Sequence, residues 1–228
     1  MSVYKKYIQE LQGFLSGSTE QRFAAQQLLC LHEEACKKDS PLIVELGVDR
    51  GQSTKVFLNA ISGKPKAKLI SLDIRDCSAA AESEQWHFVQ QNSADINTLL
   101  QSHPEIKQGI DLLYVDSLHT QMHVKAEIYG FFEYLNKGAV VFFDDVESTP
   151  YMQGQRKDSI GTEVANRKIL QLLEAIFRAN YHALDFSLMM GSTGLAKFIK
   201  RTALGDKLND PVFLRSRNFQ LLWKILDR

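Results

Sequence analysis

Three aspartates that follow apolar runs carry the clearest chemistry of the sequence. Asp116 ends one such run, and the pair Asp144-Asp145 ends the next one along the chain. Three carboxylates brought together without a cation raise one another's pKa values by several units, and a divalent ion removes that repulsion. Oxygen ligands select a hard cation such as Mg²⁺, which keeps positions open for water or substrate oxygens. We predict a metal site formed by Asp116, Asp144 and Asp145. The alternative for Asp144 or Asp145 is a helix cap or a solvent-exposed carboxylate.

A histidine stands beside the first of these aspartates. His119 follows Asp116 by three residues, near the start of a predicted helix. Its imidazole would face the same opening and accept a proton from a metal-bound hydroxyl, so we predict that it is the general base. The alternative is a hydrogen-bonded surface histidine. His123 gives His-x-x-x-His, a spacing that zinc sites also use, but the other available ligands are carboxylates and no cysteine is near.

A second group of residues surrounds a glycine-framed turn. Glu45 lies near the end of an apolar run, Gly47 and Gly51 frame the turn that follows it, and Ser53 begins a predicted helix. The glycines allow the backbone to approach a ligand closely, and the free amides of a new helix favour a carboxylate or phosphate. A turn of this kind is often purely structural, so it needs a second signal.

Asp73 supplies that second signal. It ends the next apolar run, about 20 residues after Gly51, where an acidic residue accepts hydrogen bonds from a ribose. The alternative is a helix cap or an ion pair with Arg75. Taken together, the glycine turn and Asp73 predict a ligand that contains adenosine.

The elements that must position these residues alternate along the chain. Near-continuous apolar runs separated by crossovers predict an α/β fold with a doubly wound, mostly parallel sheet that is buried on both faces. The predicted strands cover residues 42–46, 69–73, 86–89, 110–116 and 139–144, and residues 181–188 and 194–199 form an antiparallel edge hairpin. Ligands of such sheets bind beyond the carboxyl ends of the strands, where the candidate residues lie.

Helical segments flank this core. Residues 3–38 carry apolar residues at helical spacing and predict two helices, broken near Gly17-Ser18, that cover one edge of the sheet. Residues 147–159 predict a loop above the sheet. We predict a single domain over residues 1–228, with an N-terminal helical extension at 1–40, an α/β core at 41–200 and a C-terminal helical segment at 201–228. The stretch from Phe213 to Leu226 is compatible with a docking helix, a dimer contact or core packing, so a homo-oligomer is left open.

The composition excludes several classes of partner. Lys and Arg together number 27, as do Asp and Glu, so no net charge draws the protein onto nucleic acid. No apolar span has the length that a bilayer requires, and the N-terminus does not resemble a signal peptide. The three cysteines lack CxxC spacing and suit a reducing compartment. We therefore expect a cytoplasmic protein without nucleic-acid or membrane partners.

Four motifs together give the sequence a resemblance to a known family. VELGVDRGQST, SLDI, IDLLYVDSLHT and GAVVFFDDV resemble the class I S-adenosylmethionine (SAM)-dependent methyltransferases over about residues 40–200. The spacing Gly-x-x-x-Gly, in place of GxGxxG, agrees with that resemblance. Within that superfamily, the D-x-x-H and Asp-Asp motifs are similar to those of metal-dependent small-molecule O-methyltransferases, especially the macrocin O-methyltransferase-like group.

The resemblance implies a Rossmann-like SAM methyltransferase fold and a role for each motif residue. The implied cofactor contacts are Glu45, Gly47, Gly51 and Ser53 at the methionine part of SAM, Asp73 at the ribose, Asn92 and Ser93 near the adenine, and Asp116. Two departures affect the expected acceptor side: Ser117 replaces the usual glycine, and Glu127 the usual aspartate.

The function expected from these observations is methyl transfer from SAM to a hydroxyl of a small molecule, with Mg²⁺ or another divalent metal orienting the acceptor. A sugar or a polyketide- or phenol-like compound would fit as acceptor. One alternative is a metal-independent N- or O-methyltransferase in which the carboxylates bind an amine directly. Another is a SAM- or nucleotide-binding Rossmann module without catalysis. Metal dependence and turnover separate the three.

Overall fold

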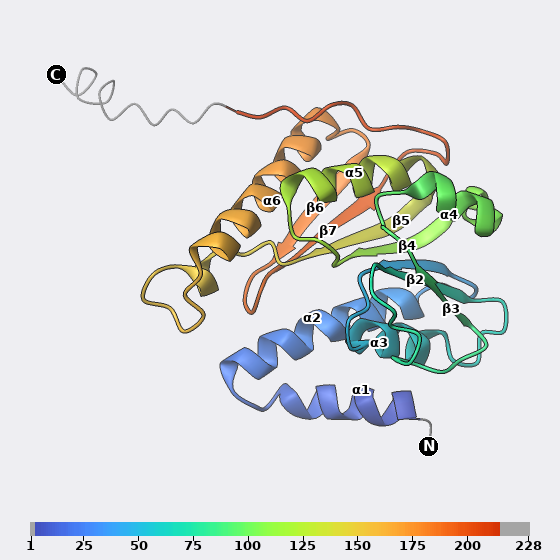
Figure 1. Ribbon diagram of the computed structural model, residues 1–228, viewed down its shortest axis with the longest axis horizontal. Helices are drawn as coiled ribbons and strands as arrows, with labels where there is room; N and C mark the ends of the chain where they lie inside the picture. The colour runs from blue at the N-terminus through green and yellow to red at the C-terminus, as the bar shows by residue number, and fades with distance from the viewer. Residues whose placement is uncertain (1–2, 215–228) are drawn as a thin grey trace.

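The computed structural model describes residues 3–214, which form one sheet between two layers of helices (Figure 1). The strand order is β3-β2-β1-β4-β5-β7-β6. The strands are β1 (Leu42–Leu46), β2 (Lys68–Asp73), β3 (Trp86–Gln90), β4 (Ile110–Val115), β5 (Leu135–Asp144), β6 (Leu184–Met189) and β7 (Leu195–Lys200). The first five pair in parallel, and β7 runs antiparallel to both β5 and β6. The predicted doubly wound sheet with an antiparallel edge is confirmed.

Six α-helices of the described chain cover the two faces of the sheet. They are α1 (Val3–Phe14), α2 (Thr19–Cys36), α3 (Gln52–Ile61), α4 (Ile96–Ser102), α5 (Gln121–Phe131) and α6 (Ile160–Ala179), with short 3₁₀ helices η1 (Pro104–Gln108), η2 (Phe132–Tyr134) and η3 (Thr149–Tyr151). Helices α1–α3 lie on one face and α4–α6 on the other (Figure 1). None of the helices within residues 3–214 is long and apolar enough to cross a membrane.

Side chains alternate along β4, so this strand contributes to the apolar clusters on both faces of the sheet. Successive residues of a strand point to opposite faces. Leu112 and Tyr114 accordingly join the apolar cluster under α1–α3, whereas Leu113 and Val115 join the cluster under α4–α6. Because both faces are covered, the strand reads as a continuous apolar run. Tyr114 and Asp116, two residues apart, are thereby placed on the same side.

The N-terminal helices divide where the sequence predicted. Ser18 caps α2 and forms a capping box with Gln21, so the second helix has a defined start. The prediction that these helices cover an edge of the sheet needs correction. Their buried side chains, such as Leu11 and Leu31, belong to the cluster that packs on one face together with α3. The reason is that α3 alone leaves part of that face open, and α1 and α2 complete the layer.

The end of the described chain follows the other face. Residues 201–214 contain no helix; they run as an irregular segment beside α5 and α6 (Figure 1). The backbone N–H of Asn209 donates to Asn180 Oδ1 at 2.8 Å, and the Tyr129 hydroxyl donates to the Asn209 carbonyl at 2.7 Å. The other half of the predicted C-terminal helical segment, residues 215–228, lies outside the described residues.

Gly47 is required where the turn after β1 passes β4. Its φ is +97°, and a Cβ at this position would lie 1.9 Å from the Asp116 carbonyl oxygen. Gly63 also has a positive φ, +81°, but a Cβ there would meet nothing within 4 Å. A comparison of substitutions at Gly47 and Gly63 therefore separates the free-energy cost of the backbone conformation from the cost of a steric clash.

We predict that Gly47→Ala lowers the free energy of unfolding more than Gly63→Ala does. The Gly63 variant should lose about 1–2 kcal/mol for its left-handed conformation, and the Gly47 variant roughly 1–3 kcal/mol more because its neighbour is backbone that must shift. Urea denaturation of both variants measures the difference. Equal losses would show that the approach of Asp116 imposes no constraint on Gly47.

Candidate active site

Two cavities adjoin at the carboxyl ends of the parallel strands. The larger has a volume of about 550 Å³ and is lined by Gly47, Asp73, Asn92, Ser93 and His119, among others. The smaller, about 170 Å³, is lined by residues of α2 and α3 together with Tyr114 and Asp144. Asp116 lines both cavities. The site therefore has a large and a small compartment that share one carboxylate.

Asp73 is fixed at the wall of the larger cavity by the glycine turn. Its Oδ2 accepts the backbone N–H groups of Val48 at 3.0 Å and Asp49 at 3.2 Å, and its Oδ1 accepts the N–H of Arg75 at 2.9 Å. Burial alone would raise the pKa of Asp73, but these three amides and the Arg75 guanidinium together lower it. The carboxylate is thus ionised and oriented before any ligand binds.

The four residues predicted at the methionine part of SAM are divided by the structure. Gly47 lines the larger cavity and Ser53 the smaller one. Glu45, fully buried, lines neither cavity in the described structure; its oxygens accept the hydroxyl groups of Ser53, Thr54 and Ser71. Burial raises the pKa of Glu45 to about 7, although the three hydroxyls oppose that shift. Gly51 lies outside both cavities, where an added Cβ would come within 2.9 Å of the Ala80 side chain.

A buried glutamate links three segments behind the larger cavity. Glu127 of α5 accepts the hydroxyl groups of Ser93 and Ser117 on Oε1, and His123 Nε2 lies 3.2 Å from the same oxygen. Oε2 has no hydrogen-bond partner among the described residues. Ser93, Ser117 and His123 all line the larger cavity. The two departures from the family pattern, Ser117 and Glu127, thus contact each other, and Ser117 lines the larger cavity.

His119 stands between two of the predicted metal ligands. Its Nε2 lies 3.1 Å from Asp116 Oδ1, and its Nδ1 lies 2.6 Å from Asp145 Oδ2. Burial would lower the pKa of His119, but hydrogen bonds and charges from Asp116 and Asp145 raise it to about 10. The ring is therefore an imidazolium near pH 7 and, in this arrangement, compensates the charge of the carboxylates.

Asp144 is the most enclosed carboxylate of the cluster. Its Oδ1 accepts the backbone N–H of Asp145 at 2.8 Å and the Thr193 hydroxyl at 3.1 Å. Burial, followed by the charges of Asp116 and Asp145, raises the pKa of Asp144 to about 7. Tyr151 of η3 stands near the same charges: burial, with Asp145 and Asp144, raises its pKa to about 12.

The acidic cluster has ligand types that suit a hard cation, but its side chains are not arranged around a common metal position. Among residues 3–214, no three His, Cys, Asp or Glu side chains are arranged to hold a metal ion, since His119 engages one oxygen of Asp116 and one of Asp145. The donor set itself fits, because three carboxylates, two of them largely enclosed, offer oxygen ligands and excess negative charge. A cation would displace His119 from at least one of its partners.

Tyr114 is a site residue that the sequence reasoning missed. Its hydroxyl oxygen lies 2.8 Å from Asp144 Oδ2 and 3.1 Å from Asp116 Oδ2, and its ring stacks edge-on against Phe57 at 5.9 Å. Burial, then the charges of Asp116 and Asp144, raises the pKa of the phenol well above its usual value, so it stays protonated. The available signal was a polar-tipped residue in an aliphatic strand, two positions before Asp116.

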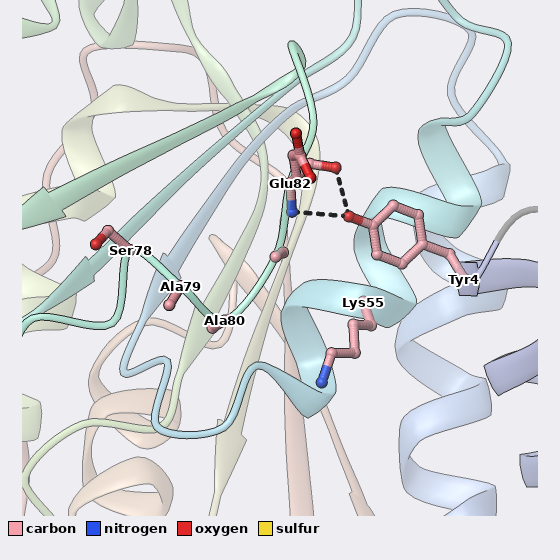
Figure 2. Close-up of a pocket in the computed structure, with 7 residues that line it drawn as sticks. Tyr4, Lys55, Ser78, Ala79, Ala80 and Glu82 are labelled. Atoms are coloured by element: carbon pink, nitrogen blue, oxygen red, sulfur yellow. Dashed lines mark hydrogen bonds between the residues drawn. The ribbon is translucent and has the colours of Figure 1, made fainter.

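A third cavity lies away from the acidic cluster. It has a volume of about 560 Å³ and lies between Tyr4 of α1, Lys55 of α3 and the segment from Ser78 to Glu82 (Figure 2). The Tyr4 hydroxyl donates to the Glu82 carbonyl at 2.6 Å and accepts the Glu82 backbone N–H at 3.0 Å (Figure 2). No predicted site residue lines this cavity. Its polar contacts serve to fasten α1 to the loop between β2 and β3.

Comparison with known proteins finds one matching family model and several solved structures of similar fold. Residues 44–146 match a family model described as a methyltransferase domain. The sequence has no match among curated proteins. The structure is similar to cofactor-bound Rv0187 from MTB, with a TM-score of 0.56 and 19% identity over 87% of this chain and 88% of that one.

Two further solved structures extend the comparison. SAH-bound methyltransferase PaMTH1 from Podospora anserina gives a TM-score of 0.62 at 12% identity and covers 89% of both chains. MycE methyltransferase from the mycinamycin biosynthetic pathway, in complex with Mg, SAH and mycinamycin VI, gives 0.56 at 17% identity, covering 93% of this chain but 57% of that one. The chain therefore has the Rossmann-like fold of these proteins, which confirms the predicted fold, and the family match over residues 44–146 supports the predicted enzyme class.

We predict that the buried Glu45 makes stability fall as pH rises. Because its pKa is about 7 in the folded protein and about 4.3 in an unfolded chain, the folded state binds the additional proton between these values. The free energy of unfolding should therefore decrease through this range, by up to roughly 1.4 kcal/mol per pH unit, and then level off. Glu45→Gln should remove that part of the slope.

Chemical denaturation between pH 4 and 8 measures this effect, with Glu84→Gln at an exposed position as the matched control. The control should keep the slope of the wild type. If Glu45→Gln also keeps it, the Glu45 carboxylate does not take up a proton on folding.

Proposed function

We propose that this methyltransferase moves the methyl group of SAM to a hydroxyl of a small molecule, with Mg²⁺ or another divalent cation at the acidic cluster. The observation that carries the proposal is the junction of the two cavities at Asp116. One compartment has the size and polar groups suited to the donor, and the other places carboxylates around a small acceptor. Methyl transfer needs donor and nucleophile in line, which two adjoining compartments provide.

The larger cavity suits SAM in volume and in chemistry. Its volume of about 550 Å³ lies within the usual range of small-molecule sites. Asp73, ionised and fixed, would accept hydrogen bonds from the ribose hydroxyls, and Asn92 and Ser93 would lie at the adenine. Ile74, which is 72% exposed, and Leu118 line the same cavity and offer apolar contacts to a base. The bound cofactor of Rv0187 and the SAH of MycE and PaMTH1 support this use.

The carboxylates Asp116, Asp144 and Asp145 would hold the cation, in keeping with the Mg present in the MycE complex. When bound, a divalent cation there would take over the charge that now retains the His119 proton, hold an acceptor oxygen and lower its pKa. Neutral His119 would then accept the hydroxyl proton at Nε2, the ring nitrogen that faces Asp116. The acceptor oxygen bonds to the methyl carbon as the carbon–sulfur bond breaks, and SAH leaves with the electron pair.

One observation favours a second candidate function. His119 already compensates Asp116 and Asp145 without a metal, so the remaining carboxylate, Asp144, is available to bind an acceptor amine directly. This enzyme would methylate nitrogen or oxygen without a cation. A donor-binding module without catalysis would bind SAM but turn over no acceptor.

We predict that Asp73→Ala weakens SAM binding more than tenfold, which corresponds to about 1.4 kcal/mol. The variant would lose both the ribose acceptor and the hydrogen bonds that hold the Val48 and Asp49 amides. Isothermal titration with SAM measures the change. Asp76→Ala is the matched control, because Asp76 bonds only the exposed Ser78 and lines neither compartment; wild-type affinity in Asp73→Ala would remove Asp73 from the site.

We predict that a chelator abolishes turnover and that Mg²⁺ or Mn²⁺ restores it, while SAM affinity changes by less than about threefold, or ~0.7 kcal/mol. Asp144→Asn should lower turnover and acceptor affinity with the same retention of SAM. A panel of hydroxylated acceptors, assayed for SAH formation, tests both statements. Full activity in excess chelator would instead support the metal-independent candidate.

We predict that His119→Ala reduces turnover by roughly 10²–10⁴-fold, the usual effect of losing a general base. The variant should keep SAM and metal bound, and its rate should recover in part at higher pH as the acceptor ionises unaided. Steady-state rates across pH 6–10 measure this. Wild-type turnover in the variant would leave His119 with only its structural ion pairs.

A further inference from the structure

The hydroxyl of Tyr114 occupies the point where the two cavity-facing carboxylates meet. It is within hydrogen-bond distance of Oδ2 of both Asp116 and Asp144, at 3.1 and 2.8 Å. The residue is 2% exposed, yet it lines the smaller cavity together with these two aspartates. A buried phenol in this position contacts both strand ends that form the acidic cluster.

The sheet fixes this arrangement. Tyr114 on β4 pairs in register with Phe142 on β5, and each of the two aspartates stands two residues further along its own strand. Since residues two apart share a face, both carboxylates lie one step beyond the row that holds Tyr114. The edge-on contact with Phe57 of α3 restricts the phenol ring from the other side.

The remaining hydrogen bonds of the two carboxylates leave Oδ2 as the atom that Tyr114 controls. Oδ1 of Asp144 already accepts the Asp145 amide and the Thr193 hydroxyl, and Oδ1 of Asp116 faces His119. Each Oδ2 keeps lone-pair capacity beyond its contact with the phenol. The Tyr114 hydroxyl is therefore the contact that the two Oδ2 atoms share.

We propose that Tyr114 is a positioning residue: its hydroxyl holds Oδ2 of Asp116 and Asp144 so that both carboxylates present an oxygen to the same divalent cation. This inference rests on the proposed metal site. Groups that hydrogen-bond to ligating carboxylates typically account for a 10–100-fold difference in metal affinity. If Tyr114 only filled the core, removal of its hydroxyl would leave the metal affinity unchanged, because the ring makes the packing contacts.

The test compares Tyr114→Phe with the wild type in direct binding of Mn²⁺, followed by the electron paramagnetic resonance signal of the free ion. The expected result is a Kd for Mn²⁺ about 10–100-fold higher in Tyr114→Phe, with unchanged affinity for SAM. Tyr4→Phe is the matched control, since it removes a tyrosine hydroxyl that, within the described structure, bonds Glu82 backbone groups (Figure 2) and lines the third cavity, which none of the three carboxylates lines. Its Mn²⁺ affinity should stay within about twofold of wild type, as expected for a substitution without contact to the site.

A second measurement uses the wild-type protein, so it does not depend on whether the Tyr114→Phe variant folds. Mg²⁺ itself has no absorption near 280 nm, so its addition to the wild type should perturb the tyrosine band of Tyr114 as the cation binds the two Oδ2 atoms that the Tyr114 hydroxyl contacts. Wild-type Mn²⁺ affinity in Tyr114→Phe, or Mg²⁺ binding without a change in the tyrosine band, overturns the role of Tyr114 and leaves the proposed function standing. A wild-type protein that binds no Mn²⁺ overturns the metal proposal and this inference with it.

Discussion

Repulsion among carboxylates at the ends of β4 and β5 is the constraint around which this site is organised. Asp116, Asp144 and Asp145 lie together in a partly buried region, where like charges are costly. His119 lies between Asp116 and Asp145 as a cation, and the Tyr114 hydroxyl, with its single proton, contacts Oδ2 of both Asp116 and Asp144. The protein thus compensates the carboxylate charge with its own side chains. A ligand of the cluster must stabilise that charge more strongly than His119 and Tyr114 do.

The shared position of Asp116 ties the two compartments together through backbone as well as side chain. Its carbonyl oxygen lies so close to Gly47 that no larger residue fits there, and its N–H donates to Leu46, extending the pairing of β1 and β4. The glycine turn and the end of β4 are therefore tied to each other by backbone contacts. In the proposed reaction, these contacts would align methyl donor and nucleophile with little further ordering.

Sequence patterns located the strand ends because the carboxyl ends of parallel strands meet at one edge of a sheet. That is why Asp73, Asp116 and Asp144 were identified as strand-end residues and why the sheet could be predicted, whereas the face covered by α1 and α2 and the irregular course of residues 201–214 were not. Partners from distant segments were not visible: Glu45 is enclosed by hydroxyls of α3 and β2, and Glu127 gathers Ser93 and Ser117. Such contacts depend on register and on the packing of helices onto the sheet, which periodicity does not encode.

Helix α2 forms a wall of the smaller cavity through Ala24, Gln27, Leu28 and Leu31, although it precedes the segment that matches the methyltransferase domain. Gln27 also donates to the Gly191 carbonyl at 2.7 Å, which closes that wall against the hairpin of β6 and β7. The smaller cavity is thus bounded by a helix that contributes none of the described residues lining the larger cavity. Under the proposed function, exchange of this helix in evolution would alter which molecule is methylated while the methyl donor and its chemistry stayed the same.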